Sequence, residues 1–305
     1  MSELWTALGD PLLRAPLITA LLIGATAPII GTFLVQRRMS LLGDGIGHVA
    51  LTGVALGWLV GAVLGLVPRD VLALPGAVVA AVIGAVAIEL VRERGRTSGD
   101  VALAMLFYGG IAGGVLIIEI AGGTNDNLVR YLFGSVATVD TANLLITVGL
   151  AALILVVGLG FRGALFAVSH DEEFARASGL PVRWLNILLA IISALTVTVA
   201  MRVVGVLMVS AMMIVPVATA QLLAASFRRT MTIAMAMGGV IAGIGLIATY
   251  WLDVSPGAAI VVLAIIIYAV IAAARAVMQR RAPRRSTTPP PPATPQEPVI
   301  AKEAT

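Results

Sequence analysis

The chain has 305 residues, of which 59% are hydrophobic and 12% are charged, and its formal net charge is +4. This composition, with its strongly positive mean hydropathy, places the chain among membrane proteins. The absence of cysteine excludes disulfides, thiolate metal sites and cysteine nucleophiles.

The apolar runs predict an all-α polytopic membrane protein. Residues 1–14 are expected to form an interfacial lead-in, and a spacing of about 20 apolar residues per span then gives about nine transmembrane helices. The predicted spans are residues 15–35, 46–67, 71–90, 101–120, 141–161, 184–201, 205–226, 230–252 and 256–276. Pro216 interrupts the seventh, which is compatible with one span or with two half-helices. The membrane domain therefore covers 15–278, and the Pro-rich segment 279–305 is expected to be a disordered cytoplasmic tail.

Basic residues are concentrated in every second connection between the predicted spans. These clusters are Arg37 and Arg38, Arg92 to Arg96, Arg162 to Arg183, Arg228 and Arg229, and the arginines from Arg275 onward. The alternation follows the positive-inside rule and does not indicate a nucleic-acid-binding surface. We therefore expect the N-terminus outside the cell and the C-terminus in the cytoplasm.

An aspartate and a histidine stand out in the connection before the second span. Asp44 and His48 are four residues apart, so on a helix they share one face. Ionisable groups next to a membrane span are costly, and a carboxylate with an imidazole suits a divalent transition metal. Two alternatives remain open, namely that Asp44 is the N-cap of the second span and that His48 bonds to a neighbouring carbonyl group.

Other motifs for chemistry are missing. The sequence has no P-loop, no His-Glu-x-x-His motif and no serine-nucleophile motif. The only histidines are His48 and His170, so an enzymatic function is not indicated. Glu89 is close to Arg92 and is expected to form an ion pair on the surface.

The loop of residues 162–183 is expected to contain a short amphipathic helix. Asp171 suits its N-cap, acidic residues follow in the first turn, and Gly179 is a natural C-terminal stop. The helix either lies on the bilayer or docks a cytoplasmic partner. Its mixture of acidic and basic residues favours a protein partner over an anionic membrane surface.

Three segments together resemble the permease subunit of bacterial ABC importers for zinc or manganese. They are residues 38–57 with Asp44 and His48, residues 171–186 with Gly179-Leu180-Pro181-Val182, and residues 204–220 with Val204-Gly205-Val206-Leu207-Met208 and Ile214-Val215-Pro216. The resemblance covers about residues 12 to 276 and leaves out the tail.

The resemblance implies a fold similar to the cobalamin and siderophore importers, in a bacterial plasma membrane. It also implies three partners besides membrane lipid: a second copy of the chain, a cytoplasmic ATP-binding cassette ATPase and an extracytoplasmic metal-binding protein. ATP hydrolysis would then belong to the ATPase chain.

The resemblance also implies roles for single residues. Asp44 and His48 would contact the metal ion. Ser210, Pro216 and Thr219 would lie beside the translocation path. The coupling helix that contacts the ATPase would comprise Asp171, Glu172, Glu173, Phe174, Ala175, Gly179, Leu180 and Pro181.

The transported ion is expected to be Zn²⁺, because Gly45 to Gly53 is similar to the zinc-type members, with Mn²⁺ or Fe²⁺ as alternatives. No resident cofactor is expected. A different hypothesis is a secondary transporter that uses Asp44 and His48 as a proton relay without an ATPase. A membrane enzyme that uses the same pair as acid and base is the weakest hypothesis.

Overall fold

The computed structural model describes residues 11–68, 70–94, 99–122, 131–134, 141–252 and 254–281. The helices in these residues are α2 (Pro11–Gln36), α3 (Leu42–Val63), α4 (Ala73–Glu93), α5 (Gly99–Ile120), α7 (Thr141–Gly160), α8 (Arg162–His170), α9 (Glu172–Ala177), α10 (Val182–Val204), α11 (Val206–Leu223), α12 (Phe227–Leu252) and α13 (Pro256–Arg281). Within this part of the chain, 9 helices are long and apolar enough to cross a membrane. The predicted all-α membrane fold is therefore confirmed.

One predicted boundary needs correction, and one alternative that the sequence left open is decided. The second span was expected from residue 46, but α3 begins at Leu42, so Asp44 lies inside the helix. The seventh span is one continuous helix, α11, with Pro216 inside it, and the break comes before it at Gly205, where φ is 83°. The lead-in up to residue 10 and the tail from residue 282 lie outside the described residues.

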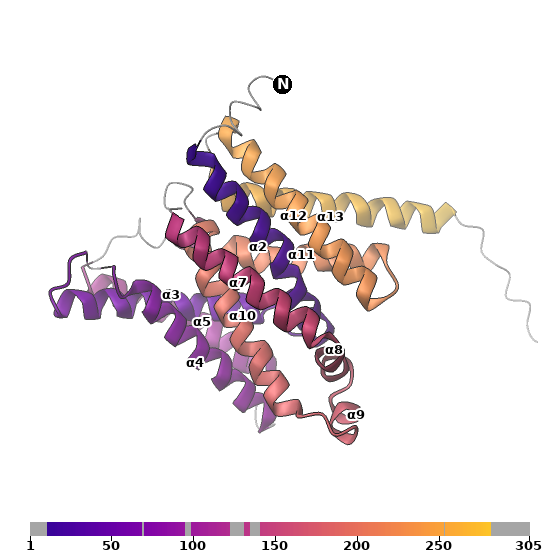
Figure 1. Ribbon diagram of the computed structural model, residues 1–305, viewed down its shortest axis with the longest axis horizontal. Coiled ribbons are helices and arrows are strands. Elements are labelled where there is room, and N and C mark those ends of the chain that lie inside the picture. The colour runs from indigo at the N-terminus through magenta and orange to yellow at the C-terminus, as the bar shows by residue number, and fades with distance from the viewer. Residues whose placement is uncertain are drawn as a thin grey trace, which may run out of the picture.

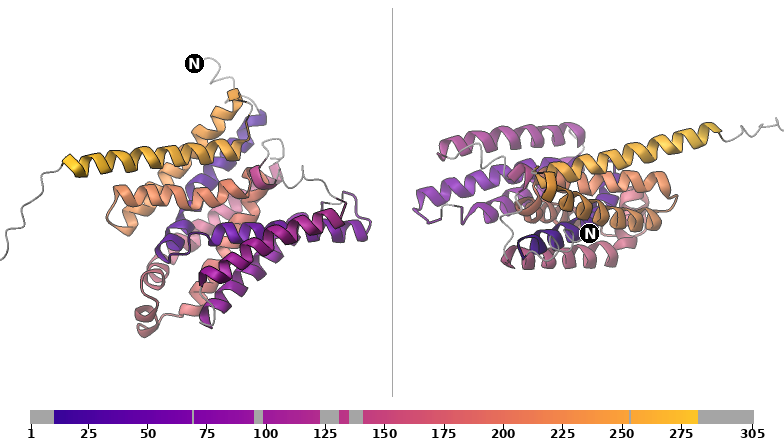
Figure 2. Two further views of the ribbon diagram at one scale, coloured as in Figure 1. Left: turned by 180° about the vertical axis from the view of Figure 1, so that it is seen from behind. Right: turned by 90° about the horizontal axis from the view of Figure 1, so that it is seen from above.

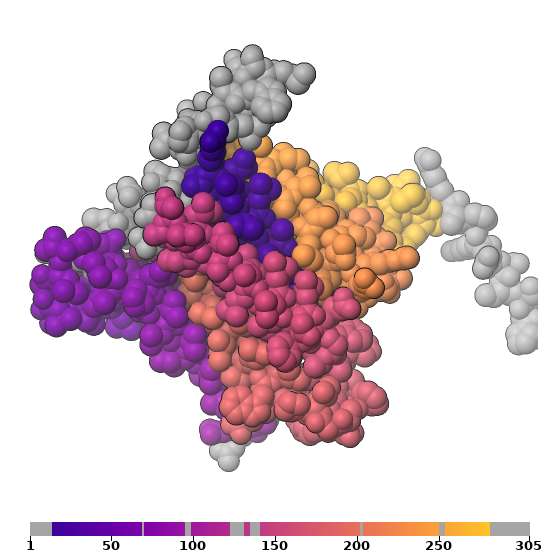
Figure 3. Space-filling model, viewed as in Figure 1, coloured from indigo at the N-terminus to yellow at the C-terminus, as the bar shows by residue number. Residues whose placement is uncertain are grey.

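Helix α2 forms the centre of the bundle. Its residues Ile29, Ile30, Phe33 and Leu34 are fully buried, and α2 packs against α12, α11 and α7. Helices α3, α4 and α5 pack together on one side of α2, and α13 extends to the other side (Figures 1 and 2). In the space-filling view the purple atoms of α3 and α4 project from the body of the molecule (Figure 3).

The connections between spans gather at two ends of the bundle. At one end, ion pairs join the α2–α3 linker (residues 37–41), the end of α4 and the short helix α9. At the other end, the segment 131–134 approaches Gly205 and Gly257 so closely that a Cβ on either glycine would overlap the backbone of Phe133. This arrangement fits spans that cross the membrane in alternating directions.

Candidate functional site

Asp44 and His48 share one face of α3, as their spacing predicts. The distance from His48 Nε2 to Asp44 Oδ1 is 3.8 Å. Asp44 lies in the first turn of α3, where the helix dipole favours a negative charge. Leu41 is the N-cap residue and makes no side-chain cap bond, so the alternative that Asp44 is the N-cap is wrong.

The His48 imidazole is held by packing. Only 7% of His48 is exposed, and its ring meets the edge of Phe107 on α5 with centroids 4.5 Å apart. Its Nδ1 atom is buried and has no hydrogen-bond partner in the described part of the chain. The imidazole is therefore fixed in place, while Nδ1 has no carbonyl partner.

Two open cavities lie beside Asp44. One of about 450 Å³ lies against α11 and α13, and one of about 290 Å³ lies against α5. Both are lined by Leu41 and Asp44. The first extends to Phe133, at the end of the bundle opposite α9, and the second extends to Asp100, where α5 begins. Asp44 therefore lines two separate cavities, which extend toward different ends of the bundle, whereas His48 lines neither of them.

The three residues expected beside the path have different positions. Ser210 lines the larger cavity with Asp44, and its buried hydroxyl has no partner among the described residues. Pro216 and Thr219 are buried in α11 and do not line either cavity. The Thr219 hydroxyl donates to the carbonyl oxygen of Val215 on its own helix at 2.8 Å. Only Ser210 thus shares a cavity with the predicted metal ligand.

Sequence reasoning missed two polar residues of the cavities. Ser40 lines the larger one and Asp100 lines the smaller one. Asp100 lies in the first turn of α5, and an acidic residue there is usually explained by the helix dipole alone. In the residues that the structure covers, no cluster of three or more His, Cys, Asp and Glu side chains could hold a metal ion. The predicted ligands Asp44 and His48 would by themselves form an incomplete ligand set.

The expected helix in the loop 162–183 is present as α9, and α8 precedes it as a second short helix. The Asp171 carboxylate accepts a hydrogen bond from the backbone N–H of Phe174 at 2.9 Å, and Gly179 follows the helix with a φ of 80°. The predicted cap and stop of this helix are confirmed.

The two faces of α9 have different surroundings. Ala175 is fully buried, and the Glu172 carboxylate is directed into the permease, where Arg92 and Asn186 each donate to it at 3.2 Å. Phe174 is 66% exposed, and Glu173 is exposed as well. Beyond α9, Leu180 is half-buried and Pro181 is the N-cap residue of α10. A large apolar side chain is thus left open on the outer face of α9.

Glu89 forms the predicted pair with Arg92, at 2.7 Å, but its expected position on the surface is wrong. The Glu89 side chain is only 1% exposed, because Arg37 covers it and approaches within 3.3 Å. Burial lowers the pKa of the Arg37 guanidinium, and the negative charge of Glu89 counteracts this shift. The Glu89 carboxylate therefore compensates the buried charge of Arg37.

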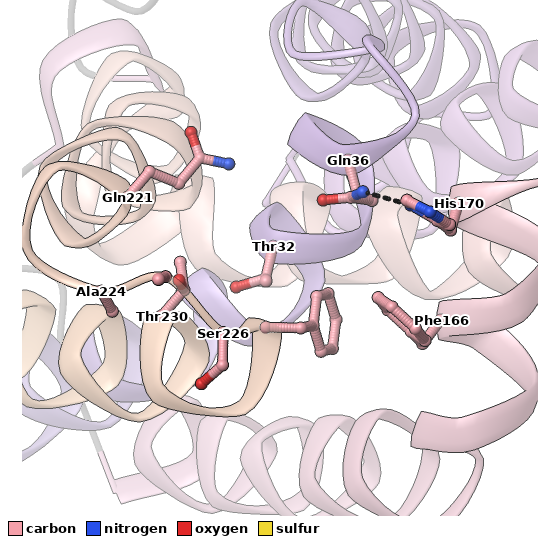
Figure 4. A pocket seen from close by; sticks show the side chains of 10 residues that line it. Thr32, Gln36, Phe166, His170, Gln221, Ala224, Ser226 and Thr230 are labelled. Atoms are coloured by element: carbon pink, nitrogen blue, oxygen red, sulfur yellow. Dashed lines mark hydrogen bonds between the residues drawn. The ribbon is translucent and has the colours of Figure 1, made fainter. Parts of the chain in front are cut away.

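A separate polar pocket of about 310 Å³ lies between the ends of α2, α8 and α11 (Figure 4). Gln36 Nε2 and His170 Nδ1 lie 3.0 Å apart at its edge. The His170 ring stacks on Phe166, with centroids 5.6 Å apart. These contacts join the end of α2 to α8, and they account for the second histidine without a metal.

Comparison with known proteins assigns this chain to a family of transporters. A model of the ABC 3 transport family matches residues 10–275. The manganese transport system membrane protein MntC of Halalkalibacterium halodurans is 34% identical over 250 residues, which cover 82% of each chain. The Haemophilus influenzae protein named "Probable iron transport system membrane protein" is 32% identical over 80% of this chain and 87% of its own.

Solved structures agree with these relatives. PsaBC from Streptococcus pneumoniae in complex with Fab aligns with a TM-score of 0.76 and 31% identity, over 88% of this chain and 94% of the other. An inward-facing metal-chelate type ABC transporter aligns with a TM-score of 0.57 and 21% identity, over 87% and 85% of the two chains. The second likeness is evidence for the fold alone.

Proposed function

The chain belongs to the ABC 3 transport family, and we propose that it is the permease through which a bacterial ABC importer carries Mn²⁺ across the membrane. As a multi-pass permease of a divalent-metal importer it is a transport subunit, not an enzyme. The observation that carries the proposal is that Asp44 lines two open cavities. His48 lines neither of them, but its Nε2 atom lies 3.8 Å from Asp44 Oδ1.

The choice of ion differs from the zinc expected from the sequence. The relatives include proteins named as manganese and iron transport proteins. Carboxylate oxygen is a hard ligand suited to Mn²⁺, and one imidazole is compatible with Mn²⁺ or Fe²⁺ as well as Zn²⁺. Mn²⁺ is therefore the first candidate and Fe²⁺ the second.

Two ligands from one chain do not complete a coordination sphere. A second copy of the permease, placed with its own Asp44 and His48 facing the same ion, would supply two carboxylates and two imidazoles. Both cavities are open at the surface of the single chain, which leaves Asp44 accessible to such a partner. The proposed transport unit is accordingly a dimer of this chain.

Two further partners follow from an importer of this kind: a cytoplasmic ATPase and an extracytoplasmic metal-binding protein. We assign α9 to the ATPase because its outer face presents Phe174, and the nearby Trp184 is 74% exposed. Because α9 then faces the cytoplasm, the C-terminus lies inside and the N-terminus outside.

The test is metal accumulation in cells that lack their own high-affinity manganese importers, complemented with this permease, its ATPase and its binding protein. Wild-type permease should restore Mn²⁺ accumulation, while Asp44→Asn and His48→Ala should each reduce it at least tenfold with unchanged membrane levels. Asp70→Asn, an exposed residue in the turn before α4, is the matched control. Wild-type accumulation in both site variants would reject the site, and rescue by zinc or iron alone would change the ion.

A further inference from the structure

A continuous chain of charged side chains connects α9 to the α2–α3 linker. Glu172 Oε2 on α9 lies 3.2 Å from Arg92 Nη2 on α4. The same Arg92 Nη2 atom lies 2.7 Å from Glu89 Oε1, and this oxygen lies 3.3 Å from Arg37 Nη2. Three elements that are 52 and 80 residues apart in sequence are thereby joined by shared atoms.

Burial makes this chain of ion pairs stiff. The side chains of Glu89 and Arg37 are 1% and 5% exposed, whereas Arg92 and Glu172 are 26% and 30% exposed. Between Arg37 and Glu172 the chain alternates positive and negative groups, and at its outer end Glu172 also pairs with the exposed Arg176 at 3.6 Å. Moving one member away would leave a charge uncompensated in a medium that solvates it poorly, so a displaced member tends to carry its partner with it.

The inner end of the chain is tied to the cavity at Asp44. Arg37 is the first residue after α2, and Arg38 has a left-handed backbone with a φ of 58°. Hydrogen bonds from Arg38 N–H and Met39 N–H to carbonyl groups of α2 fix the turn. Ser40 and Leu41 then line the larger cavity directly before α3. Only five residues separate α2 from α3, so a shift of Arg37 cannot be absorbed as slack in the linker.

We propose that Arg37, Glu89 and Arg92 are positioning residues that transmit movement of α9 to the cavity at Asp44. When the ATPase displaces α9, Glu172 draws Arg92, and Glu89 passes the displacement to Arg37 and the linker. The cavity then opens or closes with the state of the ATPase. This inference rests on the proposed function, because it takes α9 as the helix that faces the ATPase.

The first test uses the permease reconstituted with its ATPase and binding protein in proteoliposomes. Glu89→Gln keeps the size of the side chain and removes its charge. We expect the complex to assemble and hydrolyse ATP, while the amount of Mn²⁺ carried per ATP falls at least tenfold. Glu93→Gln is the matched control, because Glu93 lies on the same helix and pairs with Arg183 at 3.5 Å, outside the chain of ion pairs. It should keep the wild-type ratio.

Glu172→Gln is a second variant, at a partly exposed position. It should lower the amount of Mn²⁺ carried per ATP in the same way. Because Glu89 and Glu172 act in series, the double variant should be no worse than the poorer single variant. A purely structural role would reduce the yield of complex and leave the ratio of Mn²⁺ to ATP unchanged. That result, or a wild-type ratio in Glu89→Gln, would overturn the proposal.

A readout that needs no metal separates this inference from the proposed function. The chain has no cysteine, so Ala258→Cys places a single reporter thiol in the cavity wall. Nucleotide should change the rate at which a soluble thiol reagent modifies this cysteine, and Glu89→Gln should abolish the change. The proposed link between α9 and the cavity is contradicted if nucleotide still changes the modification rate in the presence of Glu89→Gln. It is also contradicted if nucleotide has no effect on Ala258→Cys alone. If nucleotide changes the modification rate as expected but the permease transports no Mn²⁺, the proposed ion is rejected and the link is kept.

Discussion

The contact between α3 and α5 at Gly110 gives a prediction that compares two neighbouring glycines. A Cβ at Gly110 would lie 2.6 Å from the carbonyl carbon of His48 and 2.7 Å from the backbone nitrogen of Val49. These are backbone atoms, so no rotamer change can relieve the overlap. A Cβ at Gly109, the preceding residue, would meet no heavy atom within 4 Å. Gly110→Ala should therefore force α5 away from His48, while Gly109→Ala should not.

The size of the effect follows from the geometry. Restoring ordinary van der Waals contact requires the helices to separate by roughly 1 Å, and overpacking of this kind costs about 1–3 kcal/mol. Separation also stretches the 2.7 Å hydrogen bond from the Thr52 hydroxyl to the Gly110 carbonyl oxygen. Gly109→Ala avoids these costs and gains up to ~1 kcal/mol of helix propensity. Gly110→Ala gains the same propensity, so this gain cancels, and the free energy of unfolding should differ by about 1–3 kcal/mol between the variants.

Thermal unfolding of the purified permease in detergent measures this difference directly. The midpoint of Gly110→Ala should lie several degrees below that of Gly109→Ala. Metal uptake should fall in Gly110→Ala as well, because the His48 imidazole loses its contact with Phe107, and it should persist in Gly109→Ala. Equal midpoints and equal uptake for the two variants would refute the close contact between α3 and α5.

Three further predictions concern α9 and the α2–α3 linker. Phe174→Ala should lower co-purification of the ATPase at least several-fold without changing the membrane level of the permease; unchanged co-purification would remove α9 from the interface. Asp171→Ala should destabilise α9 by about 1 kcal/mol through loss of its cap, seen as faster backbone hydrogen exchange in α9. Arg38→Gly should stabilise the permease by about 1 kcal/mol, because glycine adopts a left-handed backbone without strain, and a lower unfolding midpoint would contradict this.

The spans could be predicted from the sequence because they depend on the length of each apolar run. The start of α3 could not, because Gly43, Gly45 and Gly47 around Asp44 have low helix propensity. Tertiary packing outweighs that propensity in the fold. A Cβ at Gly47 would lie 2.4 Å from the Val206 side chain, so small residues are required where α3 meets α11.

The predictions about charged residues were correct where the interactions are local and wrong where the partner is distant in sequence. The cap of α9 at Asp171 depends on residues within one turn, and it could be read from the sequence. The burial of Glu89 depends on Arg37, which is 52 residues away in the chain, and the direction of Glu172 depends on Arg92, 80 residues away. No pattern within one segment contains this information, so sequence reasoning placed Glu89 on the surface.

The proposed site, with two ligands from each chain, would suit a transporter for a physical reason. A carboxylate oxygen binds a first-row divalent metal at about 2.0–2.2 Å, and the bond is lost when the oxygen moves by roughly 1 Å. If two copies share the ion, a small displacement of each α2–α3 linker changes the distance between the ion and both Asp44 carboxylates at once. The His48 imidazole packs against Phe107, so Asp44, which is 25% exposed, would be the more mobile of the two proposed ligands. Affinity for the ion would then be controlled by the linker rather than by the number of ligands.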